Sequence, residues 1–395
     1  MKHRLEREFI FLILFVTTSY HIGSAHIDTP EDIIKRENYP VETHAVETED
    51  GYILSVPRLP NPSGFPVFLQ HGLLCSAGDW VVNGKNRSLA FLLWDAGYDV
   101  WLGNVRGNTY SKKHKTLSVD EAAFWDFSWH DIGYHDVPSV VEYIVNTTGK
   151  DELFYVGISM GGAYFSVMST ERPEVARHLK AAVLLVPAVY DRHVRYNILR
   201  TMSKNWRQVQ ILFETFNIHE VFGRNSLTNQ VSDKFCRVAY VGQWLCRKFI
   251  FNILREDPKQ IDSNKIPEFL NSFPAGTSAK MLIHWFQMID NKDFQHFDYG
   301  KEKNLIMYNS TEPPKYNLSK IQPPVAVFHS KHDDVVQPKD VLRFYNQVPN
   351  KLGEYDVGHS FTHFDFQIGI NATEFVYNKI LDIFEKLNQD HAENS

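Results

Sequence analysis

The sequence predicts an α/β protein with a doubly wound, mostly parallel sheet, and three observations support this prediction. Five short apolar runs bounded by turn residues are typical of strands buried on both faces. Helical patterns alternate with these runs, as in a sheet covered by helices. The composition is that of a globular protein, with 395 residues, 43% hydrophobic and 22% charged, so the chain is long enough to bury a large core.

The expected elements follow one another along the chain. The predicted strands are 66–70 (PVFLQ), 98–102 (YDVWL), 153–156 (LFYV), 181–186 (AAVLLV) and 324–328 (PVAVF). The predicted helices between them are 87–96, 136–146 and 163–170. From about residue 187 to 315 the alternation gives way to long helical stretches rich in Phe, Trp, Met and Ile. We therefore expect one domain, residues 26–395, with a helical cap or lid inserted at about 187–315.

The amino terminus has the pattern of a secretory signal peptide over residues 1–25. Three basic residues precede the apolar octet 9–16, and Gly23, Ser24 and Ala25 provide small residues for cleavage after Ala25. Eight apolar residues are too few to cross about 30 Å of hydrocarbon, which needs roughly 20, so a membrane anchor is the weaker alternative. We expect a secreted or lysosomal protein without a transmembrane anchor.

Five glycosylation acceptors agree with passage through an oxidising, lumenal compartment. Each is an Asn-x-Ser or Asn-x-Thr triplet without proline. The acceptor residues are Asn86, Asn146, Asn309, Asn317 and Asn371.

Charge and motif content argue against several classes of function. Lys and Arg number 41 against 47 acidic residues, for a net charge of −6, and no basic tract is present, so a nucleic-acid partner is not expected. The histidines and aspartates at 329–334 and 359–363 have metal-ligand composition but lack a metal-binding spacing, so we expect no metal and no cofactor. Cys75 has the pattern of a buried, inert thiol.

Gly157-Ile158-Ser159-Met160-Gly161 is the strongest local signal for chemistry. It follows the predicted strand 153–156 directly, and a predicted helix begins just behind it. On such a strand-to-helix turn a serine hydroxyl projects above the sheet, and a Cβ at the flanking positions would clash in the bend. The motif therefore predicts Ser159 as a nucleophile.

A serine nucleophile needs a histidine base and an acid that orients it. In the α/β-hydrolase order both follow the serine, with the acid first. Asp333 or Asp334 follows the predicted strand 324–328, and His359 or His363 lies further on. The residues alone leave both pairs open.

The turn after the first predicted strand is a candidate for the oxyanion hole. His71-Gly72-Leu73-Leu74 follows strand 66–70, where a backbone N–H could reach the substrate. The helix that begins after Ser159 offers a second source of N–H groups.

Several blocks over nearly the whole mature chain resemble the acid lipase family, which includes gastric lipase and lysosomal acid lipase. The matching blocks are Thr48–Leu54, Leu69–Leu74, Ser88–Phe91, Asp95–Ser111, Pro274–Ser278 and His284-Trp285. Together they are far more specific than the serine motif alone. The resemblance implies an α/β-hydrolase fold and a lipase activity that needs no cofactor.

The resemblance also favours particular site residues. The family's acid opens a block like 333–341, which favours Asp333, and its base opens a block fourteen residues before a Tyr-Asn pair, which favours His363. The family's oxyanion donors correspond to Leu73 and Met160. A cysteine pair in the family's cap corresponds to Cys236 and Cys246 as a disulfide.

The sequence departs from the family beside the serine. The family has Gly-His-Ser-Gln-Gly, whereas this chain has Ile158 and Met160 around Ser159. Backbone amides donate to the oxyanion, so activity is still expected, but the family's acidic optimum need not apply.

We therefore expect a lipase that hydrolyses triacylglycerols or sterol esters at a lipid–water interface through a Ser-His-Asp acyl-enzyme mechanism. The alternatives are a catalytically silent lipid-binding protein of the same fold, a short-chain esterase or acyltransferase, and a metal-dependent hydrolase. The sequence does not determine the oligomeric state.

Overall fold

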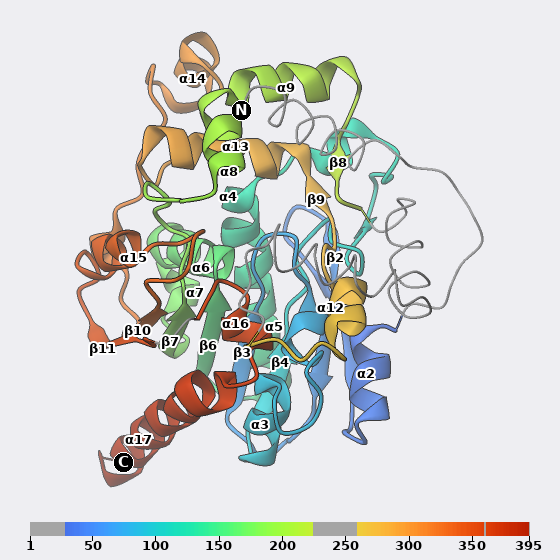
Figure 1. Ribbon diagram of the computed structural model, residues 1–395, viewed down its shortest axis with the longest axis vertical. Helices are drawn as coiled ribbons and strands as arrows, with labels where there is room; N and C mark the ends of the chain where they lie inside the picture. Colours follow the sequence, from blue (N-terminus) through green and yellow to red (C-terminus); the bar gives the residue numbers. More distant parts are fainter. Residues whose placement is uncertain (1–27, 224–258, 359–360, 395) are drawn as a thin grey trace.

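A computed structural model describes residues 28–223, 259–358 and 361–394, and its centre is a nine-stranded, mostly parallel sheet (Figure 1). The strand order is β1-β2-β4-β3-β6-β7-β10-β11, with β5 paired to β2. Pairing is parallel from β4 through β11, and antiparallel where β1, β2 and β5 meet the sheet. The strands are β1 (Glu42–Glu47), β2 (Tyr52–Leu59), β3 (Pro66–Gln70), β4 (Asp99–Leu102), β5 (Lys113–His114), β6 (Leu153–Ile158), β7 (Leu179–Leu185), β10 (Val325–His329) and β11 (Lys351–Asp356).

The five predicted strands are confirmed as β3, β4, β6, β7 and β10. Every residue of β3, β4, β6 and β10 is buried, which is why each strand is mostly apolar in sequence. No apolar run marks β1 or β11 in the sequence, since only Val46 of β1 is buried and β11 has no buried residue. Strands at sheet edges carry polar side chains, so apolar runs do not reveal them.

Helices cover the sheet and join its strands, and the predicted helices correspond to α3, α5 and α6. Helix α5 ends at Thr148, and the left-handed conformation of the next residue, Gly149 (φ 66°), is a common way for a helix to stop. The α-helices outside the 187–315 segment are α2 (Pro30–Arg36), α3 (Leu89–Asp95), α4 (Trp129–Asp131), α5 (Val137–Thr148), α6 (Met160–Glu171), α7 (Pro173–Ala176), α15 (Pro338–Tyr345), α16 (Asp365–Ile368) and α17 (Asn378–Asn394). Shorter helical turns are η1 (Ala77–Trp80), η2 (Ala122–Trp125), η4 (Leu318–Lys320) and the π-helical η3 (Ile132–Asp136) and η5 (Thr373–Tyr377).

In the described residues between β7 and β10, helices prevail over strands, but these helices do not all lie together. Figure 1 shows α8, α9, α13 and α14 at the top of the molecule, whereas α12 lies lower, where its Glu268 contacts Arg36 of α2. The elements are α8 (Asn197–Lys204), α9 (Trp206–Thr215), α12 (Ile266–Ser272), α13 (Ala279–Asn291), α14 (Lys301–Tyr308) and the short sheet of β8 (Glu220–Val221) and β9 (Thr277–Ser278). The boundaries of the cap, and its movement as a unit, stay predictions.

Candidate active site

Ser159 occupies the sharp turn between β6 and α6 in a conformation that few residues other than glycine adopt. Its φ is 53° and its ψ −118°, a region that costs on the order of 1–3 kcal/mol for a residue with a side chain. Hydrogen bonds across the sheet hold it, because its N–H donates to the carbonyl of Leu185 and its carbonyl accepts from Ala188, each at 2.9 Å. The backbone strain is therefore supported by β7 and the residues that follow it.

The two glycines of the serine motif are required by space. A Cβ on Gly157 would lie 2.7 Å from the ring of Tyr155, and one on Gly161 would lie 2.7 Å from the carbonyl oxygen of Gln70. Both distances are shorter than real carbon contacts, so a side chain at either position would push β3 or the turn itself out of place. The two glycines of the motif therefore allow a tight turn that packs against β3.

His363 links Ser159 to Asp333 through two hydrogen bonds. The imidazole Nε2 lies 3.0 Å from the Ser159 hydroxyl, and Nδ1 lies 2.7 Å from Asp333 Oδ2. An ionised carboxylate only accepts, so Nδ1 carries a hydrogen in this arrangement and, in the neutral ring, Nε2 accepts from the serine. The base end of the histidine thus faces the hydroxyl.

Asp333 is fully buried in the loop after β10 and is held from both sides. Its Oδ1 accepts from the backbone N–H groups of Val335 (2.7 Å) and Val336 (2.9 Å), while Oδ2 faces His363. Burial of His363 opposes its protonated form, but the charge and hydrogen bond of Asp333 outweigh burial and raise the pKa of His363. The carboxylate therefore makes this imidazole a stronger base.

Of the two acids that the residues alone left open, Asp333 is the one that contacts His363. Asp334, next to Asp333, faces Arg195 instead, at 3.8 Å. His359, the alternative histidine, lies outside the described residues.

The two expected oxyanion donors flank Ser159. Met160 is the first residue of α6, so its N–H is among those without an intrahelical acceptor. Leu73 follows Gly72, on which a Cβ would lie 2.9 Å from the Cβ of Ser159. Within the described residues, no backbone acceptor is assigned to the N–H of Leu73 or Met160. Both groups are therefore candidates for hydrogen bonds to a ligand at Ser159.

Comparison with known proteins shows the fold and the family of the chain. Residues 66–365 match the model of the α/β hydrolase fold, and residues 30–84 match that of the partial α/β-hydrolase lipase region. Human lipase member K is 34% identical over 369 residues, which cover 91% of each chain. The chain belongs to the acid lipase family.

Two further relatives are a lysosomal acid lipase/cholesteryl ester hydrolase and a gastric lipase. The first, from Macaca fascicularis, is 34% identical over 90% of each chain. The second, human gastric triacylglycerol lipase, is 33% identical over 94% of this chain and 96% of its own. Like its family, the protein is a carboxylic ester hydrolase.

Solved structures resemble this lipase in fold. A thermophilic esterase from Thermogutta terrifontis has a TM-score of 0.50 at 14% identity, covering 88% of this chain and 99% of its own. A bacterial membrane phospholipase A has a TM-score of 0.51 at 11% identity over 91% of each chain. At these identities the likeness shows only that the fold is shared.

Asp191, in the loop after β7, is an acidic residue near the triad of this lipase that the sequence did not suggest. It is fully buried, and its Oδ2 accepts from the indole N–H of Trp285 at 2.6 Å. Its Oδ1 has no partner within the described part of the chain. Burial raises the pKa of Asp191 to about 7. The negative charge of its ionised form raises the pKa of His363. An isolated aspartate in a loop has no sequence signal that distinguishes it from a solvated one.

The remaining predicted residues fall at the surface or outside the described residues. Asn86, Asn146, Asn309 and Asn317 are exposed and Asn371 is half-buried, so the first four are accessible to a glycan. Cys236 and Cys246 lie outside the described residues, and Cys75 is buried with a free thiol. Glycosylation and the disulfide stay predictions.

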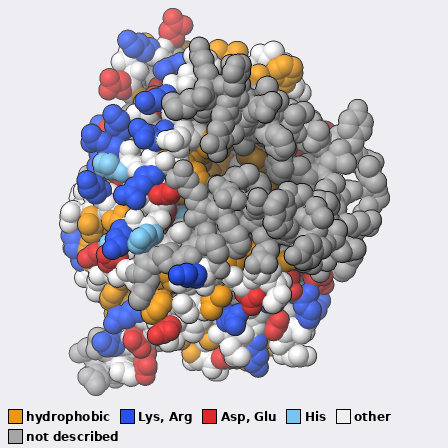
Figure 2. All heavy atoms as spheres, viewed as in Figure 1, with side chains coloured by type: hydrophobic (Ala, Val, Ile, Leu, Met, Phe, Trp, Pro, Cys, Tyr) orange, Lys and Arg blue, Asp and Glu red, His pale blue; other side chains and the backbone are white. Residues whose placement is uncertain are grey.

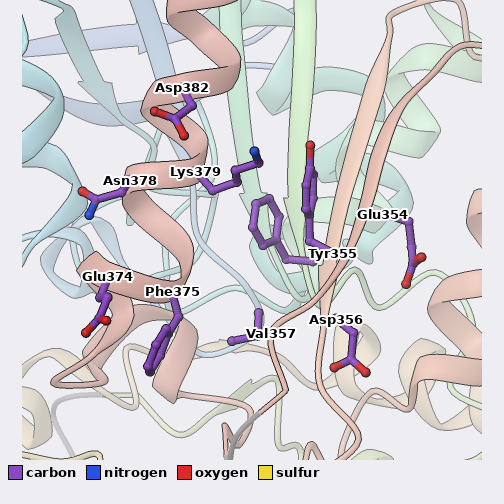
Figure 3. Close-up of a pocket in the computed structure, with 10 residues that line it drawn as sticks. Glu354, Tyr355, Asp356, Val357, Glu374, Phe375, Asn378, Lys379 and Asp382 are labelled. Carbon is purple, nitrogen blue, oxygen red and sulfur yellow. The ribbon is translucent and has the colours of Figure 1, made fainter.

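A groove of about 520 Å³ lies on another part of the molecule (Figure 3). It is lined by residues of β11, η5 and α17 and includes none of the three residues of the triad. Among the lining residues are Glu354, Tyr355, Asp356, Glu374, Lys379 and Asp382.

No helix of the described residues is both long and apolar enough to cross a bilayer.

Proposed function

We propose that this protein hydrolyses carboxylic esters of lipids with Ser159 as nucleophile, His363 as general base and acid, and Asp333 as the orienting acid. The observation that carries the proposal is the continuous hydrogen-bonded chain from Asp333 through His363 to Ser159. A serine hydroxyl is a weak nucleophile until a positioned base removes its proton.

The reaction divides into acylation and deacylation. Ser159 Oγ attacks the acyl carbon while His363 Nε2 takes its proton, and the N–H groups of Leu73 and Met160 stabilise the oxyanion. The ester C–O bond then breaks, and His363 returns the proton to the leaving alcohol. Water attacks the acyl-enzyme by the same steps and releases the fatty acid and Ser159.

Ile158 and Met160 replace polar residues of the family, and the proposed reaction uses neither side chain. The oxyanion donor at position 160 is the backbone N–H, and the side chains of both residues are buried. Buried side chains act here through packing, so we expect their effect on rate or acyl preference rather than on the reaction type.

An apolar cluster beside the site supports a fatty acyl substrate. Leu74 and Cys75, which follow the proposed donor Leu73, pack with Phe269, Phe273 and Phe364. Phe364 directly follows His363, and its ring lies 5.0 Å from that of Phe273. An acyl chain that leaves the carbonyl on this side would meet aromatic and aliphatic surface.

Action at a lipid–water interface is supported by apolar side chains exposed on α9 and α14. Ile211 and the α9 cap residue Phe216 are 60% and 66% exposed, and Ile306 on α14 is 82% exposed. Figure 2 shows apolar side chains at the upper surface, in the region of α9 in Figure 1. Exposed apolar surface of this kind marks interaction sites.

Delivery to the cell exterior or to lysosomes is part of the proposal, together with cleavage of residues 1–25, a Cys236–Cys246 disulfide and glycans on the five acceptors. The names of the lysosomal and gastric relatives support this. Triacylglycerols and sterol esters are the substrates that the same names suggest.

Replacement of Ser159 by Ala tests the proposal. Wild-type protein should react with a fluorophosphonate active-serine probe and hydrolyse glycerol or sterol esters in a chain-length series. Ser159→Ala should lose labelling and at least about 10⁴-fold in kcat. Ser169→Ala is a matched control, since Ser169 is a buried serine of the helix that follows the nucleophile.

Other outcomes separate the alternatives. Turnover that survives in Ser159→Ala would refute the mechanism, and its loss in a chelator would favour a metal-dependent hydrolase. Binding of acyl ligands without labelling would favour a silent lipid-binding protein. Turnover of short esters alone would favour an esterase, and transfer to an added alcohol an acyltransferase.

A further inference from the structure

His71 is a buried histidine beside the site for which the proposed reaction gives no role. It follows β3 directly, is 1% exposed and precedes Gly72 and the proposed oxyanion donor Leu73. Its ring reaches from this turn to the loop 103–111. Both segments belong to family-like blocks in the sequence, and their contact joins them into one network.

Backbone donors determine which nitrogen of His71 carries the hydrogen. The N–H of Val105 points at Nε2 of His71 at 3.3 Å, and a backbone N–H can only donate. Nε2 is therefore the acceptor, so Nδ1 carries the hydrogen and donates to the carbonyl of Gly72 at 2.8 Å. Burial lowers the pKa of His71 to about 4, which keeps this neutral form above that pH.

The side chain of Asn108 is also oriented by backbone donors, and its amide nitrogen lies near the same ring nitrogen of His71, Nε2. Its Oδ1 accepts from the backbone N–H groups of Tyr110 (3.0 Å) and Ser111 (3.1 Å), so its amide nitrogen must face the other way. That nitrogen lies 2.9 Å from Asn104 Oδ1 and 3.3 Å from His71 Nε2. The orientation of the amide follows from its backbone donors.

Asn104 anchors this pair to the sheet and to the far end of the turn. Its side-chain nitrogen donates to the carbonyl of Ser55 in β2, and its Oδ1 also accepts from the N–H of Ala77 in η1, both at 2.9 Å. The turn 71–77 is thus held at both ends by one buried polar network. Such a network is rigid when all of its members are paired.

The orientation of one peptide unit connects the network to the reaction. The carbonyl of Gly72 and the N–H of Leu73 belong to the same trans peptide, so they point in opposite directions. His71 and the N–H of Cys75 hold the carbonyl on one side, which directs the N–H of Leu73 to the other. Ser159 lies against Gly72 at this turn.

We infer that His71 and Asn108 are positioning residues for the oxyanion hole, because they fix the Gly72–Leu73 peptide so that the N–H of Leu73 faces the acyl oxygen. This inference rests on the proposed function, since it requires an oxyanion formed at Ser159. A lost oxyanion donor costs about 10²–10³ in kcat, and misalignment of one donor costs up to that amount. The loss belongs to the transition state, so KM changes little.

Kinetics of His71 and Asn108 variants on a soluble short-chain ester test the inference. His71→Leu removes the donor to Gly72 and should lower kcat by roughly 10- to 10³-fold, with KM changed by less than about 3-fold. His71→Asn places an amide N–H near the position of Nδ1 and should recover part of the loss. Asn108→Leu should lower kcat in the same way, by roughly 10-fold.

A boronic acid inhibitor provides a second readout, because it forms a tetrahedral adduct on the serine. Its affinity should fall in each variant by about the same factor as kcat. Asn304→Leu is the matched control, since Asn304 is a buried asparagine that organises the turn before α14 through the N–H of Tyr299 and Asp298 Oδ1. It should lower the Tm without lowering kcat.

The outcomes separate this inference from the proposed function. If Ser159→Ala is inactive but folded Asn108→Leu and His71→Asn keep wild-type kcat and boronate affinity, the positioning role is refuted and the proposed function stands. If KM rises while kcat is unchanged, the network shapes the binding site instead, which also refutes it. If Ser159→Ala is active, the proposed function fails first.

Discussion

Two regions of this lipase bury histidines, and the same side chain has opposite acid–base properties in them. One is the triad, where His363 lies between Ser159 and Asp333. The other, here called the aromatic cluster, joins α4 and α13 to the segment after α13. It consists of Trp129, His130, His284, Phe294, His296 and Tyr316.

The histidines of the aromatic cluster pack against rings, and no hydrogen bond to a carboxylate is found for them within the described residues. His284 stacks on Trp129 at 4.0 Å, and His296 stacks on Tyr316 at 4.5 Å. Burial lowers the pKa of all three, to about 4 for His296, and the charge of Asp131 does not overcome it at His130. The pKa of His363 is raised instead, because the charge and hydrogen bond of Asp333 outweigh burial.

The difference shows what makes a buried histidine a base. Desolvation alone leaves a neutral ring that packs like an aromatic residue, whereas a carboxylate on Nδ1 stabilises the imidazolium that catalysis requires. Removing the carboxylate, replacing a titratable ring of the aromatic cluster, and changing the charge near His363 each test this contrast.

Removing the carboxylate should have the largest effect. Asp333→Asn leaves the shape of the side chain but removes the charge that orients and stabilises the His363 imidazolium. We expect kcat on a soluble ester to fall about 10⁴-fold. Asp334→Asn is the neighbouring control and should change kcat by less than about 3-fold. If Asp334→Asn lost activity and Asp333→Asn kept it, the orienting acid would be Asp334.

Acidification should destabilise the aromatic cluster. The pKa of His296 is about 4 in the fold and about 6.5 in the unfolded chain, so below pH 6.5 the unfolded state binds more protons and stability falls. At pH 5 the loss from this group is at most about 2 kcal/mol, from 1.4 kcal/mol per pKa unit. His296→Phe keeps the ring and should lose less stability between pH 7 and pH 5.

Urea unfolding at the two pH values measures this difference. His332→Phe replaces an exposed histidine and should follow the wild type. Equal acid sensitivity of His296→Phe and wild type would show that His296 is protonated in the fold, and would remove the contrast with His363.

Asp191 should have the smallest effect, on the pH dependence of the triad. It faces His363, Asp333 and Asp340, and Asp340 is paired with His193. Its negative charge raises the pKa of His363, so Asp191→Asn should move the acid limb of kcat/KM to lower pH, by about half a unit.

Trp285→Phe is the companion variant, because it removes the hydrogen bond that favours ionised Asp191. It should shift the acid limb in the same direction as Asp191→Asn. An unshifted limb in both variants would mean that Asp191 serves only as the acceptor for Trp285.

The sequence by itself determined the buried strands, the serine turn and the order of the site residues. These are local properties: an unbroken apolar run follows from burial on both faces, and the glycines at 157 and 161 follow from contacts made within one turn and the adjacent strand. Family resemblance was needed to favour Asp333 over Asp334 and His363 over His359.

Only the tertiary structure decided which groups meet. His363 is 30 residues from Asp333 and 204 from Ser159, so the contacts between them depend on where the strands β6 and β10 place their loops. The same holds for Asp191 and Trp285, and for His71 and Asn108, since neither pair has a spacing that indicates contact. Local sequence specifies backbone shape and burial, but the pKa of a buried group depends on neighbours that the fold brings from elsewhere in the chain.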